Sequence, residues 1–306
     1  MSSRSVVAVG LPNAGKSTFI AALTYVLKNQ EVTTQLRFKK LPEEMTYLTA
    51  LVNDWLDCVP FERTKHALHR LEFSLQTADN AVGVITFPDI SGETFEQHWA
   101  LREWEPDFAK LAETANGVLL FLNPKSSEKP FSIVAQKKIE AVLDLSDGMI
   151  DSPESDASAS HTNDKDEVGS RLNEKQGAVI WDPKKATSQV KLADILQMLA
   201  NRASNLPLRV GVIVSAWDII KEKEPAAQPD HWLADYVPFL DGFLKMNPEM
   251  FVTRIYGVSA QGGDNERDGE KLRALDMPTL RIKVQGQDCG EHDITAPLKW
   301  VLRLDA

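Results

Sequence analysis

Residues 10–17 read Gly-Leu-Pro-Asn-Ala-Gly-Lys-Ser and form a complete G-x-x-x-x-G-K-S motif. An apolar run over 6–9 precedes the motif, and an amphipathic stretch over 18–27 follows it. A strand, a glycine-rich loop and a helix in this order are the context in which the motif binds phosphate. The motif therefore predicts a phosphate-binding loop between the first strand and the first helix.

The glycines of this loop predict a backbone whose N–H groups point at an anion. Without a Cβ, Gly10 and Gly15 let the chain wrap a phosphate at the N-terminus of a helix. Lys16 supplies a positive charge for the β- and γ-phosphates, and the hydroxyl of Ser17 is a ligand for Mg²⁺. The loop residues that we expect to contact a nucleotide are Gly10, Asn13, Ala14, Gly15, Lys16, Ser17 and Thr18.

Composition argues against several other classes. No run reaches the roughly 18 apolar residues of a membrane helix. Because the start leads straight into the first strand, we expect no signal peptide. No basic stripe indicates a nucleic-acid partner. Cys58 and Cys289 lack the spacing of a metal site, and we interpret them as reduced thiols of a cytoplasmic protein.

Strand-like and helix-like segments alternate along the chain, which predicts a mostly parallel sheet covered on both faces. Segments 70–76 and 82–88 are expected to pair antiparallel across a tight turn. The expected strands are 5–9, 33–38, 70–76, 82–88, 117–122, 209–215, 253–258 and 280–285. The expected helices are 16–28, 43–57, 95–114, 131–145, 186–203, 231–246 and 293–303.

The net charge of −10 is concentrated in one segment. Residues 144–168 contain eight acids and one lysine, which gives −7 and leaves −3 for the remainder. The stretch 146–176 is rich in Ser and Asp and poor in apolar residues, so it cannot bury enough surface to offset the entropy of ordering. We expect one domain over residues 1–306 with a disordered insertion at about 146–176.

A second candidate site follows the apolar strand 82–88. Asp89 at the end of that strand would lie beside a bound Mg²⁺, and the backbone N–H of Gly92 would face the γ-phosphate and hinge when that phosphate leaves. An ordinary turn is the alternative for this spacing.

Two further candidate sites end later strands. After 210–215 the chain reads Ser-Ala-Trp-Asp, where guanine-specific proteins carry Asn/Thr-Lys-x-Asp. Asp218 would accept the N1 and N2 hydrogens of guanine, although Ala216 lacks the lysine stem that packs over the base. A helix N-cap is the alternative role for Asp218. One helix and one strand later, Ser259 and Ala260 follow, and the N–H of Ala260 would reach guanine O6.

These four motifs, in this order, resemble the translation-factor-related (TRAFAC) P-loop GTPases over most of the chain outside 146–176. The strings at 117–124, 215–218, 256–261 and 293–300 look closest to the bacterial double-GTPase families. The resemblance implies an α/β fold of the Ras-like P-loop GTPase type. It also implies a second GTPase or an effector as partner, in bacterial conflict or defence loci.

The resemblance places a Mg²⁺-binding threonine between the first helix and strand 70–76. Thr33 and Thr34 begin a strand-like run, so Thr64 in the polar connector is the preferred candidate. The adjacent Arg63 is either an arginine finger in cis or a surface arginine.

Two residues bear on the rate of turnover. Glu93 occupies the position at which Ras-like proteins keep a water-orienting glutamine, and a carboxylate near phosphate repels it unless protonated or paired, which predicts slow turnover. Asn13 stands where similar loops of potassium-stimulated GTPases use an asparagine to hold K⁺; the alternative is that Asn13 only stabilises the loop.

The sequence as a whole predicts a switch that binds and hydrolyses GTP. The expected catalytic residues are Lys16, Arg63, Thr64 and Glu93, and the expected metal ligands are Ser17, Thr64 and Asp89. The expected ligands are GTP or GDP and Mg²⁺, with K⁺ as an open alternative. A non-hydrolysing nucleotide-dependent scaffold stays open as a second function. An ATPase stays open as a third, because the Asn-Lys pair before Asp218 is missing.

Overall fold

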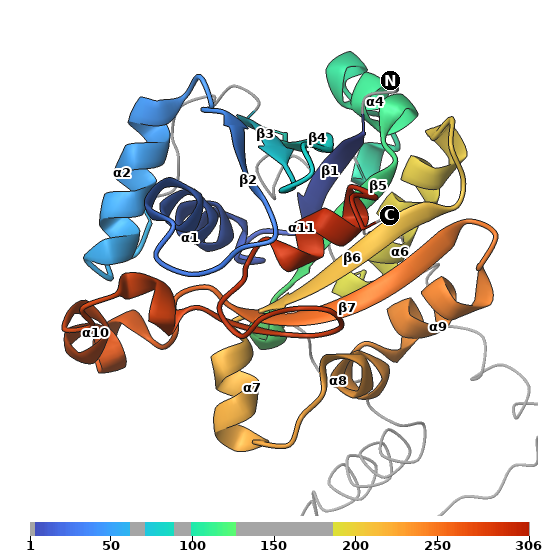
Figure 1. Cartoon of the computed structure of the whole chain (residues 1–306). Coiled ribbons are helices and arrows are strands. Elements are labelled where there is room, and N and C mark those ends of the chain that lie inside the picture. Colours follow the sequence, from blue (N-terminus) through green and yellow to red (C-terminus); the bar gives the residue numbers. More distant parts are fainter. Residues whose placement is uncertain (1–3, 62–70, 89–98, 127–185, 306) are drawn as a thin grey trace, which may run out of the picture. The chain divides into compact units, whose positions relative to one another are not determined.

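The computed structural model describes residues 4–61, 71–88, 99–126 and 186–305. Within these ranges, eight strands form one sheet in the order β2-β3-β4-β1-β5-β6-β7-β8 (Figure 1). The strands are β1 (Ser5–Gly10), β2 (Arg37–Lys40), β3 (Leu71–Gln76), β4 (Val82–Phe87), β5 (Gly117–Leu122), β6 (Leu208–Ser215), β7 (Phe251–Ser259) and β8 (Lys283–Gln285). The expected insertion at 146–176 lies outside the described residues.

The middle of the sheet is parallel and its edges are antiparallel. The five adjacent strands β4, β1, β5, β6 and β7 run parallel to one another. The pairs β2–β3, β3–β4 and β7–β8 are antiparallel. The prediction of a mostly parallel sheet is confirmed, as is the hairpin of β3 with β4, which pairs Leu71 with Phe87. Because parallel strands end at one edge, the loops after β1, β5, β6 and β7 meet there.

The helices in the described ranges are mostly short. They are α1 (Lys16–Asn29), α2 (Met45–Leu56), α4 (Pro106–Thr114), α6 (Ser188–Arg202), α7 (Trp217–Lys223), α8 (Pro229–Tyr236), α9 (Pro238–Met246), α10 (Asn265–Arg273) and α11 (Ala296–Val301), with 3-10 turns at η1 (Pro124–Ser126) and η3 (Pro278–Arg281). None of the helices in this part of the chain is long and apolar enough to cross a membrane.

Side chains of the sheet are buried on both faces. Along β1, Val6 and Ala8 belong to a core cluster that also holds the apolar faces of α1 and α11. Val7 and Val9 are equally buried but lie outside that cluster, as does Leu196 of α6. Since alternate residues of a strand point to opposite faces, helices cover both faces, as expected. The helices α4 and α9 both contact α6 in this second layer.

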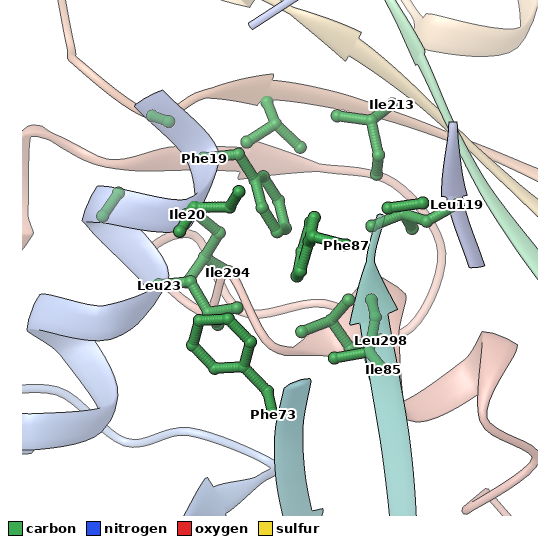
Figure 2. Close-up of a cluster of buried hydrophobic side chains, with 14 of the residues drawn as sticks. Phe19, Ile20, Leu23, Phe73, Ile85, Phe87, Leu119, Ile213, Ile294 and Leu298 are labelled. Atoms are coloured by element: carbon green, nitrogen blue, oxygen red, sulfur yellow. The ribbon is translucent and has the colours of Figure 1, made fainter. Parts of the chain in front are cut away.

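The core cluster that contains Val6 and Ala8 attaches α1 to the sheet. Figure 2 shows Phe19 and Ile20 of α1 facing Phe87 of β4 and Leu119 of β5. The ring of Phe19 also meets Phe121 edge-on, with ring centroids 5.2 Å apart. This packing fixes the start of α1, and with it the loop that precedes the helix, over the sheet.

Three predicted helices are shorter or divided in the structure. In the expected helix 231–246, Pro238 has no N–H to continue the helix, so α8 ends and α9 begins there. In the expected helix 95–114, residues 99–101 are helical, but Arg102 has a positive φ of 58° and α4 begins only at Pro106. The expected helix 293–303 is confined to α11. The expected helix 131–145 lies outside the described residues.

The predicted strand at 33–38 is wrong in its first half. The backbone N–H of Gln35 donates to the carboxylate of Asp293 at 3.1 Å, and that of Leu36 donates to the Thr295 hydroxyl at 3.1 Å. Side chains of a distant loop therefore satisfy this segment, and β2 begins only at Arg37. Similarly, the expected strand 280–285 is a 3-10 turn followed by β8.

Candidate functional site

The phosphate-loop motif forms the turn between β1 and α1. Gly10 is the last residue of β1, and Gly15 is the N-cap of α1 with a φ of 89°. The N–H of Ala14 donates to the carbonyl of Leu11 at 3.2 Å and closes the turn. The first turn of α1 contains no acidic residue, so the partial positive charge at this helix end is not offset locally. Such a helix end favours an anion.

Close packing explains why the loop carries glycines at its two ends. A Cβ on Gly10 would lie 2.9 Å from the Cβ of Phe121, and a Cβ on Gly15 would lie 2.7 Å from the Cβ of Ser215. The side-chain amide of Asn123, which follows β5, donates to the carbonyl of Asn13 at 2.7 Å. The loop is therefore held against the ends of β5 and β6.

Lys16 folds back over this loop. Its Nζ donates to the carbonyl of Gly10 at 2.5 Å and to that of Leu11 at 3.2 Å. Burial of the ammonium lowers the pKa of Lys16 to about 8, because an apolar environment disfavours the charged form. An anion bound at this loop would restore the pKa of Lys16, so the structure provides a cation that a phosphate stabilises.

Asp218 and Ser259 form a hydrogen-bonded pair at the same edge of the sheet. The hydroxyl of Ser259 donates to a carboxylate oxygen of Asp218 and accepts from the N–H of Gly262 at 3.1 Å. Asp218 is the second residue of α7, whose N-cap is Ala216 in a left-handed conformation with a φ of 47°. The alternative of an N-cap role for Asp218 is therefore wrong. The carboxylate is instead oriented by the residue that ends β7.

A large side chain fixes the start of α7 on the sheet. Trp217 is 2% exposed, and its Nε1 donates to the side-chain carbonyl of Gln285 at 2.9 Å. Gly257 makes room for the indole, since a Cβ there would lie 2.3 Å from the Trp217 ring. Because Asp218 follows directly, the position of its carboxylate depends on this packing.

The departures from the guanine motif at 215 and 216 have structural consequences. The hydroxyl of Ser215 donates to the carbonyl of Leu122 at 2.9 Å and joins the ends of β5 and β6. Ser215 also lies against Gly15, and a larger residue at position 15 would displace the loop because its Cβ would lie 2.7 Å from the Cβ of Ser215. Sequence reasoning did not find this role, nor the anchoring role of Asn123. The polar residue directly after β5 was the available signal for Asn123.

The structure brings the phosphate loop, Asp218, Ser259 and Ala260 to one edge of the sheet. The other expected site residues lie outside the described residues and stay predictions: Arg63, Thr64, Asp89, Gly92 and Glu93. Their context is partly described, since β4 ends at Phe87, two residues before Asp89, and runs parallel beside β1. Within the described ranges, no cluster of three or more His, Cys, Asp or Glu side chains could hold a metal.

Thr33 and Thr34 are far along the chain from the start of α1. Ser17 lies in the first turn of the fourteen-residue helix α1, which is about 20 Å long, and the two threonines follow its opposite end. The hydroxyl of Thr34 donates to the carbonyl of Leu36 at 2.8 Å. This placement disfavours both threonines as ligands of a metal held by Ser17, and Thr64 remains the candidate.

The sequence profile of the family described as Double-GTPase 1 matches residues 7–301. Three similar solved structures are each 12% identical to this chain. The Methanosarcina barkeri Roco2 RocCORdC bound to GDP has a TM-score of 0.30, over 89% of this chain and 48% of that chain. The S. cerevisiae Ski7 GTPase-like domain bound to GTP has a TM-score of 0.42, over 98% and 49%. The structure of sup35 complexed with GDP has a TM-score of 0.27, over 85% and 37%.

This chain spans less than half the length of each of these three chains. No curated protein matches the sequence.

Proposed function

We propose, from the premise that this chain belongs to the Double-GTPase 1 family of GTPases, that it is a slow, Mg²⁺-dependent GTPase switch. One observation carries the assignment of the site. The loop 10–17 lies against Ser215, and Asp218, three residues later, is hydrogen-bonded to Ser259. A phosphate-binding element and a fixed carboxylate thus lie at one edge of parallel strands, where ligands of α/β sheets bind.

The phosphates would bind at the loop and the first turn of α1. The left-handed Gly15 turns the chain so that successive N–H groups converge, and the ammonium of Lys16 would exchange its loop carbonyls for phosphate oxygens. Asn13 and Ala14 would contribute backbone contacts, and the Thr18 N–H would extend the same cradle.

The base would bind at Asp218 and Ala260. The bond from Ser259 occupies one lone pair of the Asp218 carboxylate and fixes its plane. The remaining lone pairs would accept the N1 and N2 hydrogens of guanine. An adenine lacks that pair of donors, so the Asp218 carboxylate would lose both hydrogen bonds to the base, which is the physical basis of preference for guanine over adenine.

The residues present fit a Mg²⁺ ion. Ser17 is exposed in the first turn of α1 and offers a hydroxyl oxygen, a ligand type that Mg²⁺ prefers. Thr64 and Asp89 would complete the protein ligands. When bound, Mg²⁺ would neutralise charge on the phosphate oxygens.

Hydrolysis would proceed by attack of water on the γ-phosphate. A new phosphorus–oxygen bond forms, the bond to the β–γ bridging oxygen breaks, and the proton of water leaves with inorganic phosphate. Lys16 would stabilise the charge that develops on the phosphates. Arg63 would add a second cation, Gly92 would sense the γ-phosphate, and Glu93 would orient the water.

The partner would be a second GTPase or an effector that reads the nucleotide state. The setting would be a paired-GTPase system of bacterial conflict or defence, and the family description, Double-GTPase 1, accords with a pair of GTPases. A cytoplasmic location accords with the two free thiols, Cys58 and Cys289.

Calorimetric titration of GTP, GDP, ATP and ADP with Mg²⁺ tests this function, followed by phosphate release in a single turnover. We expect binding of GTP and GDP, little binding of the adenine nucleotides, and slow phosphate release. The variant Lys16→Ala should lose nucleotide binding with an unchanged circular dichroism spectrum. Equal affinity for ATP would favour the ATPase, and binding without phosphate release would favour the scaffold.

A further inference from the structure

The C-terminus of α2 is joined to the loop that follows β7. The indole Nε1 of Trp55 donates to the carbonyl of Ala260 at 3.0 Å, and Trp55 is fully buried. The bond spans 205 residues of sequence. It fixes the peptide plane on the C-terminal side of Ala260, and thereby restricts the orientation of the neighbouring N–H.

Side-chain contacts surround this bond. The side-chain amide of Gln261 donates to the carbonyl of Trp55 and to the sulfur of Cys58, each at 3.3 Å. The guanidinium of Arg281 lies over the Trp55 ring, 3.8 Å from its centroid, and donates to the Cys58 sulfur at 3.2 Å. Residues 55, 58, 260, 261 and 281 are called the α2 junction below.

A close backbone approach and a further hydrogen bond stabilise the α2 junction. Gly262 has a φ of 90°, and a Cβ there would lie 2.5 Å from the carbonyl oxygen of Arg281. Arg273 in the last turn of α10 donates to the carbonyl of Asp57 at 3.0 Å. The loop after β7, the end of α2 and the end of α10 therefore form one packed body.

We infer that Trp55 is a positioning residue for base recognition, acting through the carbonyl of Ala260 on the N–H that faces O6 of guanine. The inference rests on the proposed function, because it concerns the same base site. Its physical basis is that the bond holds the peptide between Ala260 and Gln261, so only the two backbone dihedral angles of Ala260 separate this held peptide from the Ala260 N–H, which therefore loses less rotational freedom on binding. The helix α2 thus becomes part of the base site although it contributes no atom that would touch the base.

The variant Trp55→Phe tests this role, because phenylalanine keeps an aromatic ring beneath Arg281 and removes the Nε1 donor together with one ring of the indole. We expect the affinity for GDP to fall about tenfold, the size of effect that follows when a buried carbonyl loses its donor. The second ligand is 2-aminopurine riboside diphosphate, which has no oxygen at C6. Its affinity should be unchanged in the variant, because no O6 contact exists to be lost.

Trp300→Phe is the matched control. Trp300 is also buried and lies beneath two guanidinium groups, those of Arg209 and Arg254, at 5.2 and 5.0 Å from its ring centroid. Trp300 lies on α11. The variant Trp300→Phe should therefore leave the affinities for GDP and for 2-aminopurine riboside diphosphate unchanged. Gln261→Leu provides a second variant of the α2 junction that keeps Trp55, and a smaller loss restricted to GDP is expected.

Equal losses for both ligands in Trp55→Phe would mean a general structural role and would overturn the inference, as would no loss for either ligand. Failure of the wild-type protein to bind GDP at all would instead remove the proposed function, and the inference with it.

Discussion

At the scale of single residues, the site depends on side chains that orient other side chains. The carboxylate of Asp218 is held by Ser259, and the phosphate loop is held by Asn123. These contacts join residues from different strand ends, so each functional group is placed by an element to which it does not belong. Substitutions here should change nucleotide binding more than stability.

The base preference should change with Asp218→Asn. The amide would offer a donor where the 2-amino group of guanine also donates, so GTP affinity should fall by about 2 kcal/mol or more. Xanthosine triphosphate, which presents an acceptor at that side of the base, should bind the variant better than GTP. Calorimetric titration of both nucleotides checks this, with Asp230→Asn in the first turn of α8 as the control. An unchanged preference for GTP would exclude Asp218 from the base site.

Nucleotide binding should become weaker as the pH rises above 8. Burial lowers the pKa of Lys16 to about 8, so below that pH the ammonium is already charged, and above it the protein must take up a proton to bind phosphate. Calorimetry of GDP binding in two buffers of different ionisation enthalpy measures that proton. Uptake should appear near pH 8 and persist in Lys28→Ala, at the other end of α1. Absence of proton uptake would show that phosphate does not contact Lys16.

At the scale of elements, glycine positions decide how closely helices approach the sheet. Gly257 of β7 lies under the Trp217 ring, whereas a Cβ on Gly242 of α9 would meet nothing within 4 Å. The two positions should therefore respond in opposite directions to the same substitution.

Gly257→Ala should lower both the free energy of unfolding and the affinity for GTP. The added Cβ would displace the indole next to Asp218, and overpacking of this kind costs about 1–3 kcal/mol. Gly242→Ala should raise the free energy of unfolding by about 0.5–1 kcal/mol, because alanine loses less backbone entropy in a helix, and should leave GTP affinity unchanged. Chemical denaturation and titration of both variants check this pair, and equal effects of the two variants would contradict it.

The phosphate loop should not require K⁺. Asn13 has a φ of 57°, a left-handed conformation that asparagine tolerates, and its carbonyl is already held by Asn123. These observations support a loop-stabilising role for the backbone of Asn13, and we expect its side-chain oxygen to hold no K⁺. We expect GTP turnover at equal ionic strength to be the same in K⁺ and Na⁺, and to fall in Arg63→Ala if that arginine is the finger in cis. Potassium stimulation that disappears in Asn13→Ala would reverse this assignment.

At the scale of the whole molecule, the described residues form one sheet whose central strands bring the site to a single edge. One face of this sheet is covered by helices from both ends of the chain, since α1 and α11 share one core. Residues that precede the segment 127–185 in the sequence and residues that follow it therefore pack into the same core.

Replacement of residues 146–176 by a short Gly/Ser linker should leave the melting temperature and GTP affinity nearly unchanged. The reason is the composition of that segment, and loop length by itself changes the free energy only slowly. Differential scanning calorimetry and GTP titration of the shortened chain check this. A large fall in either quantity would mean that the segment folds onto the rest of the protein.

Elements with local signals could be predicted from the sequence. The G-x-x-x-x-G-K-S motif needs only its own flanks to specify a loop and a helix N-terminus, and the apolar runs of β5 and β6 indicate buried parallel strands whatever lies beside them. These predictions were confirmed because short-range chemistry specifies them.

Tertiary structure alone decided the features that depend on distant partners. Residues 33–36 read as a strand, but the backbone N–H groups of Gln35 and Leu36 donate to the side chains of Asp293 and Thr295. An N-cap role was the alternative to base recognition for Asp218, and its position as the second residue of α7, after the N-cap Ala216, excluded that alternative. The pairing of Trp55 with Ala260 has no local signal, because contacts across 205 residues depend on how the elements pack and not on the pattern within either one.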